Sequence, residues 1–256
     1  MLETQSLTVR FGGHVAVNDV SCAYAPGTLT AIVGPNGAGK TTYFNLISGQ
    51  LRASAGTVAL NGRDLTTLSA PARMHAGLGR AFQLTQLFPR LSVHENVRLA
   101  LQSRQQGMGW RHIRFWRTWR DDRGLMDRAD ALLERTRLAS RRDQPAADLP
   151  HGDQRKLEIA MLIALEPAVF MFDEPTAGMS VDDVPIVLDL IRELKADVSK
   201  TILLVEHKMD VVRELADRIV VLHNGRLMAD GDPAAVIASP IVQQAYLGIS
   251  APEVAA

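Results

Sequence analysis

The sequence feature that most constrains the fold is a glycine-rich loop at residues 34–41, which reads GPNGAGKT. An apolar, β-rich run precedes it at residues 28–33, and a stretch typical of a helix follows at residues 40–48. The loop matches the pattern G-x-x-x-x-G-K-[ST], whose glycines let backbone N–H groups turn toward phosphate oxygens at the positive end of a helix. An ordinary glycine-rich turn would not need that strand and helix around it. The loop therefore predicts a nucleoside triphosphate site within an α/β fold.

The rest of the chain alternates apolar runs of strand length with amphipathic stretches. The apolar runs lie at residues 168–172, 201–205 and 218–222, and the amphipathic stretches lie at 184–196 and 209–215. Strand and helix patterns in this order predict a mostly parallel sheet that is covered by helices.

One segment, from about residue 92 to 165, breaks this rhythm and reads as nearly all helix. We therefore predict a single domain in which a helical subdomain interrupts the α/β core. Within residues 1–256, the core is assigned to residues 1–90 and 160–248, the helical subdomain to about 91–159, and a loose tail to 249–256.

Composition excludes several classes of protein. The 256 residues carry 28 basic and 28 acidic side chains, so a protein held on nucleic acid by overall charge is not expected. The longest apolar runs are too short to cross a bilayer, and the N-terminus lacks the apolar region of a secretory signal. The single cysteine, Cys22, cannot form an internal disulfide. A cytoplasmic protein is the expectation that remains.

A second acidic motif complements the loop. Four apolar residues at 169–172 are followed by Asp173 and Glu174. A strand that ends there would place Asp173 where it holds Mg²⁺ and Glu174 where it polarises an attacking water. In the loop, Lys40 would reach the β- and γ-phosphates, and the Thr41 hydroxyl would be a further Mg²⁺ ligand.

Taken together, these residues resemble the ATP-binding cassette (ABC) ATPases, and five further positions match that superfamily in order. Phe11 resembles the aromatic residue that stacks on adenine, and Gln83 resembles the glutamine that senses Mg²⁺ and the attacking water. Residues 149–154, LPHGDQ, occupy the signature position, residues 176–180 occupy the D-loop, and His207 resembles the switch histidine. The resemblance also implies an N-terminal antiparallel β portion beside the ATPase core.

The resemblance implies ATP and Mg²⁺ as cofactors and assigns each site residue a role. The catalytic residues are Glu174, His207 and Gln83, and the metal ligands are Thr41, Gln83 and Asp173. The residues assigned to nucleotide binding are Phe11, Gly34, Pro35, Asn36, Gly37, Ala38, Gly39, Lys40, Thr41, Thr42 and Gly152.

Two motifs depart from the pattern of the superfamily. The usual signature is Leu-Ser-Gly-Gly-Gln, and here Pro150 and His151 stand in place of its serine and first glycine, before Gly152. The loss of the serine hydroxyl is expected to weaken the contact with the γ-phosphate in the opposite subunit. Ser180 stands where the D-loop usually carries aspartate.

Finer resemblance points to the ATP-binding subunits of branched-chain amino acid importers and of the related amide or urea importers. It lies in residues 152–160, 172–179, 205–210 and 244–248 and in the long helical insertion. Such a subunit needs membrane permease subunits, a second ATPase subunit in a homo- or heterodimer and, indirectly, a periplasmic or extracellular solute-binding protein. It would lie on the inner face of the cell membrane, and residues 87–97 resemble the segment that receives a permease helix. Alternatives are an export or lipid-extraction ATPase, a non-transport ABC ATPase and a simple phosphotransferase.

The helical insertion has an unusual charge. Residues 98–142 carry twelve arginines against five acidic residues, and they include all three tryptophans, Trp110, Trp116 and Trp119. We favour a solvated basic face over a small aromatic core for residues 110–123. The alternative is a face that lies near anionic lipid headgroups or acidic loops of a permease.

Overall fold

A computed structural model describes residues 1–81, 87–106, 123–240 and 242–243. Its central sheet has six strands in the order β10-β9-β3-β8-β7-β6. Strands β9, β3, β8, β7 and β6 run parallel, and the edge strand β10 pairs antiparallel with β9. This confirms the predicted mostly parallel sheet. The strands are β3 (Leu29–Val33), β6 (Leu78–Ala81), β7 (Val169–Asp173), β8 (Thr201–Val205), β9 (Arg218–His223) and β10 (Arg226–Gly231).

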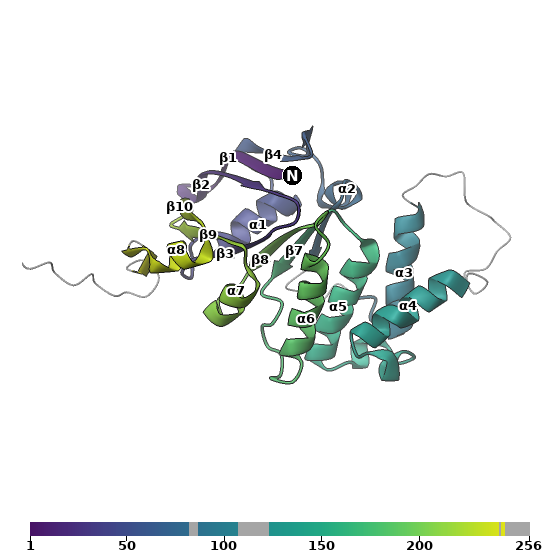
Figure 1. Cartoon of the computed structure of the whole chain (residues 1–256). Coiled ribbons are helices and arrows are strands. Elements are labelled where there is room, and N and C mark those ends of the chain that lie inside the picture. The colour runs from purple at the N-terminus through teal and green to yellow at the C-terminus, as the bar shows by residue number, and fades with distance from the viewer. Residues whose placement is uncertain (82–86, 107–122, 241, 244–256) are drawn as a thin grey trace, which may run out of the picture.

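A second, four-stranded sheet is antiparallel and lies at the N-terminus, as the resemblance implied. Its order is β2-β1-β4-β5, and helix α1 (Lys40–Ser48) lies between the two sheets (Figure 1). Phe44 of α1 is fully buried in a core that both sheets share. The strands are β1 (Leu2–Phe11), β2 (His14–Tyr24), β4 (Ala55–Leu60) and β5 (Arg63–Asp64).

The central strands are apolar without alternation because helices cover both faces of the sheet. Every residue of β3, β7 and β8 is buried. Helix α6 packs one apolar stripe against this sheet, with Val187, Leu190 and Ile191 buried at helical spacing. The helices around the sheet are α2 (Ala70–His75), α5 (His151–Leu165), α6 (Val184–Lys195), α7 (Met209–Leu215) and α8 (Pro233–Ala238).

The helical insertion begins with a capping box. The Ser92 hydroxyl accepts from the Glu95 N–H at 3.1 Å, and the Glu95 carboxylate accepts from the Ser92 N–H at 2.9 Å. Leu101 joins Leu157 of α5 in the same apolar core as the sheet residue Phe170. The described insertion consists of α3 (Val93–Gln106), α4 (Arg123–Arg135) and the 3₁₀ turns η3 (Ala139–Arg141) and η4 (Ala146–Asp148), which lead into α5.

Helices α3 and α4 lie at the opposite side of the molecule from α7 and α8 (Figure 1). In the described ranges, no helix has the length and apolar character that crossing a bilayer requires. Four sequence predictions fall wholly or largely outside the described residues: Gln83, the arginine–tryptophan segment 110–123, residues 244–248 and the tail at 249–256. The proposed division at residue 159 falls within α5 and stays a prediction.

Candidate functional site

The candidate site lies where three neighbouring parallel strands end. β3, β8 and β7 are adjacent, so their carboxyl ends share one edge of the sheet. The residues that follow them are Gly34, Glu206 and Glu174. Segments more than 100 residues apart in sequence therefore meet at the edge where α/β proteins bind ligands.

The loop after β3 has a backbone that only glycine tolerates at two positions. Gly34 has φ 153°, and a Cβ there would lie 2.1 Å from the Leu222 carbonyl oxygen. Gly39 has φ 94°, and a Cβ there would lie 2.6 Å from the Ala16 carbonyl oxygen. Gly39 is also the N-cap of α1 and has no side chain to cap it, so the first N–H groups of α1 are left to a ligand.

Lys40 is held against its own loop. Its side chain is buried, and Nζ donates to the carbonyl oxygens of Gly34 at 2.7 Å and Pro35 at 2.9 Å. Burial lowers the pKa of the Lys40 amine, an effect that the carboxylates of Glu174 and Asp173 oppose. The lysine thus lies between the loop and the two acidic residues, where a phosphate chain would find a positive charge.

Asp173 ends β7 and is almost completely buried. Its Oδ2 atom lies 2.7 Å from a guanidinium nitrogen of Arg80, whereas its Oδ1 atom has no hydrogen-bond partner among the described residues. Burial raises the pKa of the Asp173 carboxyl group, and the Arg80 charge opposes that shift. A buried oxygen without a partner fits a carboxylate that awaits a cation or a metal-bound water.

Glu174 and His207 face each other. The Nε2 atom of His207 lies 2.8 Å from Oε1 of Glu174, and both side chains are partly exposed. Glu174 adopts φ 49°, in the left-handed region that non-glycine residues rarely occupy, while its N–H donates to the Val205 carbonyl at 2.9 Å. Its carboxylate is thereby set at the sheet edge beside the histidine.

A buried glutamate supports this histidine. The side chain of Glu206 accepts a hydrogen bond from the Thr176 hydroxyl at 2.6 Å and another from the His207 N–H at 3.0 Å. It therefore joins the start of the D-loop to the loop that carries His207.

The remaining predicted ligands differ in exposure. Phe11, at the end of β1, is 51% exposed, as an aromatic that stacks on a base requires. Asn36, Gly37 and Thr41 are exposed, and Thr42 is half-buried.

The signature segment lies beside the D-loop of its own chain. α5 begins at His151, directly after Pro150, which has φ −56° and is the N-cap. In the first turn, a Cβ on Gly152 would lie 2.8 Å from a carboxylate oxygen of Asp183. Likewise, a Cβ on Gly178 of the D-loop would lie 3.3 Å from the Cε1 atom of the His151 ring.

Two charged residues of this region were not predicted from the sequence as parts of the site, namely Arg80 and Glu206. Both side chains are almost completely buried. Arg80 contacts Asp173, and Glu206 contacts His207. For Glu206 the sequence held a signal, because this charge directly follows the apolar run 201–205 and a buried charge requires a partner, whereas Arg80 stands in a short segment without a strand pattern.

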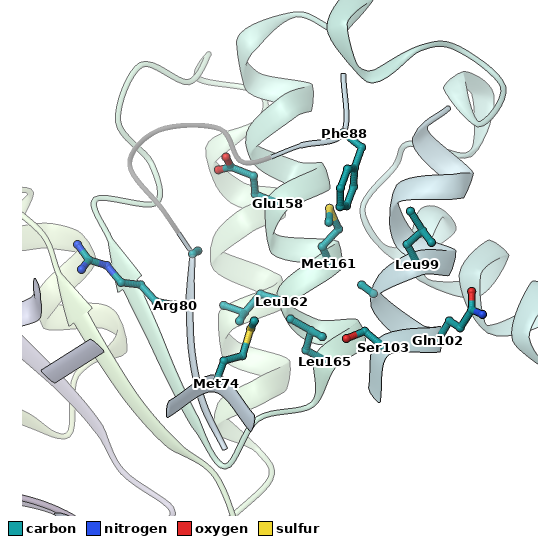
Figure 2. Close-up of a pocket in the computed structure, with 12 residues that line it drawn as sticks. Met74, Arg80, Phe88, Leu99, Gln102, Ser103, Glu158, Met161, Leu162 and Leu165 are labelled. Atoms are coloured by element: carbon teal, nitrogen blue, oxygen red, sulfur yellow. The ribbon is translucent and has the colours of Figure 1, made fainter. Parts of the chain in front are cut away.

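A groove of about 500 Å³ lies between the end of β6 and the helices α3 and α5. Figure 2 shows Phe88, Leu99 and Met161 facing into it, whereas the Arg80 guanidinium extends away from these helices. Phe88 is 50% exposed although it is a large aromatic. An open apolar surface of this kind is typical of a site for another protein segment.

Comparisons with known proteins agree with this geometry. The sequence profile of the family described as "ABC transporter" matches residues 17–177. The chain is 36% identical to the high-affinity branched-chain amino acid transport ATP-binding protein LivG of Escherichia coli (strain K12), over 97% of this chain and 98% of that protein. It is 35% identical to BraF of Pseudomonas aeruginosa, a protein with the same description, over the same shares.

A solved structure shows the same fold. The ADP conformation of MJ1267, an ATP-binding cassette of an ABC transporter, superposes with a TM-score of 0.79. The two chains are 29% identical, and the match covers 97% of this chain and 99% of the other.

Proposed function

The chain belongs to the ABC transporter family, and on that premise we propose that it is the subunit that binds and hydrolyses ATP to power an importer of branched-chain amino acids. The solute class rests on similarity to LivG and BraF, since the pocket that selects the solute would lie in other subunits. The location proposed with this function is the inner face of the cell membrane, against the permease.

One observation carries the ATPase assignment: Lys40, Asp173 and the Glu174–His207 pair meet at the carboxyl ends of β3, β7 and β8. The loop amides and the N-terminus of α1 bind the phosphates, and Lys40 neutralises charge on the β- and γ-oxygens. Phe11 offers an exposed ring to the adenine.

The residues present fit Mg²⁺. Asp173 contributes a buried carboxylate with one oxygen unpartnered among the described residues, and Thr41 contributes an exposed hydroxyl at the start of α1. Both are hard oxygen donors, which Mg²⁺ prefers. Held by these two residues, Mg²⁺ would supply positive charge that offsets the negative charge developing on the phosphates during transfer. Gln83 is proposed as a further ligand on the resemblance alone.

Hydrolysis then depends on Glu174. Its carboxylate accepts a proton from the water that attacks the γ-phosphorus, and His207 keeps that carboxylate in place through the 2.8 Å contact. Glu206 holds the backbone of the histidine loop, so the pair is set before the nucleotide arrives.

The site in one chain is half of a complete one. Gly152 lies close to Asp183, and His151 lies close to Gly178 of the D-loop in the same chain. We propose that Gly152 and the N-terminus of α5 complete the site of a second ATPase subunit. The apolar groove that Phe88 borders is proposed to receive a helix of the permease, as the resemblance of residues 87–97 implies.

The deciding experiment is co-purification followed by transport. The chain, expressed with its neighbouring membrane and solute-binding proteins, is expected to form a complex that accumulates labelled leucine in vesicles when ATP is supplied. The complex that carries Lys40→Ala is expected to assemble without accumulating leucine. A complex that exports lipid, or a chain that binds no membrane protein, contradicts the importer assignment.

A groove variant tests the docking surface. Phe88→Asp is expected to reduce recovery of the permease at least tenfold, because it buries a charge in an apolar contact. The matched control is Val198→Asp, at an apolar side chain that is 77% exposed and absent from the groove. Equal recovery with both variants would place the permease elsewhere.

A further inference from the structure

We propose that Arg80 is a positioning residue for the metal ion that accompanies the nucleotide. By holding one oxygen of the Asp173 carboxylate, it leaves the other oxygen to the metal. The inference rests on the proposed function, which supplies the nucleotide and Mg²⁺. It extends that function to a side chain for which the nucleotide-binding motifs specify no role.

The guanidinium of Arg80 is fixed on both sides. Its Nη2 atom donates to Oδ2 of Asp173 at 2.7 Å, and its Nη1 atom donates to the Asn45 side-chain oxygen at 2.6 Å and to the Ser48 hydroxyl at 3.0 Å. Asn45 and Ser48 belong to α1, the helix that follows the phosphate loop. Arg80 therefore ties the Asp173 carboxylate to the element that presents the phosphate-binding amides.

The contact with Arg80 gives the two carboxylate oxygens of Asp173 different surroundings. The side chain of Asp173 is 0% exposed and that of Arg80 is 5% exposed, so neither group exchanges its partner freely with water. Oδ2 is taken by Arg80, while Oδ1 is buried and without a hydrogen-bond partner in the described part of the chain. A carboxylate held in this way cannot turn to satisfy Oδ1 with a protein donor, which keeps that oxygen available to a cation.

Arg73 is the control residue for Arg80, since both are buried arginines that pack on α1. Arg73 donates there to the Leu46 and Ile47 carbonyl oxygens, both at 2.7 Å. Its other hydrogen bonds go to the carbonyls of Leu68 and Thr66. Arg73 thus stabilises the fold by binding backbone carbonyl oxygens, whereas Arg80 binds the side-chain carboxylate of Asp173.

The test measures Mg²⁺-dependent binding of the fluorescent nucleotide mant-ADP, without turnover. Wild type, Arg80→Met, Arg80→Lys and Arg73→Met are titrated with MgCl₂ and compared with samples in EDTA, after circular dichroism has confirmed folding. In Arg80→Met the Mg²⁺ concentration for half-maximal gain in affinity is expected to rise roughly 10–100-fold, the range for loss of an outer-shell partner. Arg80→Lys is expected to shift it less, because it keeps the charge but loses the planar fork.

Arg73→Met is expected to keep the wild-type Mg²⁺ requirement even where it lowers the melting temperature. An unchanged requirement in Arg80→Met overturns the proposal, and so does a lower one, which would mean that Arg80 competes with the metal. If Arg80→Met does not fold, Arg80→Lys decides by the same criterion. A wild-type chain whose mant-ADP binding ignores Mg²⁺ contradicts the proposed function itself, which is a separate and recognisable failure.

Discussion

The two halves of the proposed nucleotide machinery are built in different ways. The half around Lys40 and Asp173 is set at strand ends, where Lys40 donates to a carbonyl of its own loop and the buried Asp173 is paired with Arg80 of another strand. The half around Gly152 consists of a helix start whose N-cap is Pro150, without a side-chain cap. It relies on backbone amides and on contacts with the D-loop of the same chain.

This difference indicates a division of labour. In the proposed function, the first half supplies the side chains for ATP binding and water activation. The second half lacks the usual signature hydroxyl at position 150, and in the proposed function it would contact the ATP of a partner subunit. Variants in the two halves should therefore separate turnover from association.

The largest effect is expected at Glu174. Glu174→Gln removes the proton acceptor but keeps an oxygen for His207, so steady-state hydrolysis should fall by roughly 10²–10⁴-fold while ATP binding persists. Phosphate release measures the first quantity and equilibrium binding the second. Glu193→Gln, at an exposed carboxylate that pairs with Arg135, is the control and should retain turnover. Near-normal hydrolysis by Glu174→Gln would remove the glutamate from the role of base.

A smaller effect is expected from restoring the signature hydroxyl. In a Glu174→Gln background with MgATP, Pro150→Ser should tighten dimerisation at least tenfold, because a hydrogen bond to charged phosphate is worth about 1.5–3 kcal/mol. Sedimentation gives the dimer fraction.

The control for that experiment is Pro150→Asp, because aspartate is also a good N-cap for α5 but brings a negative charge toward phosphate. It should stabilise the chain without promoting dimers. If both variants dimerise as their parent does, the missing hydroxyl has no part in association.

The smallest effect concerns Ser180, whose hydroxyl donates to Asp183 at 2.8 Å. Hydrogen bonds from Lys156 and then from Ser180 lower the pKa of the Asp183 carboxyl group. The Asp183 carboxylate therefore stabilises the fold at pH values above its pKa in the unfolded chain. This stabilisation is lost as the pH falls through its lower pKa in the folded chain. Ser180→Ala should lower the free energy of unfolding by about 0.5–1 kcal/mol at pH 7. This difference from wild type should become smaller below about pH 4, where the carboxylate is protonated.

Urea unfolding at a series of pH values measures this difference. Ser199→Ala removes a similar hydroxyl contact, to Asp197 at 2.6 Å, at a fully exposed site and should have a smaller effect. A pH-independent difference for Ser180→Ala would show that the hydroxyl acts through packing rather than through the carboxylate.

Much of the fold was predictable because its signals are local. The helices predicted at residues 40–48 and 209–215 and the strand at 201–205 have the bounds that the structure gives them. The strand β6 carried no such signal, since its four residues are Leu, Gly, Arg and Ala. It exists because it pairs with β7, a tertiary contact that no short window of sequence contains.

The sequence by itself determined the phosphate loop, the acidic end of β7 and the helix starts, because glycine conformations, apolar periodicity and capping act over a few residues. Only the tertiary structure decided which charges meet. Arg80 and Asp173 are 93 residues apart, and Glu174 and His207 are 33 apart. The sheet order β8-β7-β6 joins them, and burial away from water makes each charge depend on the partner that this order supplies.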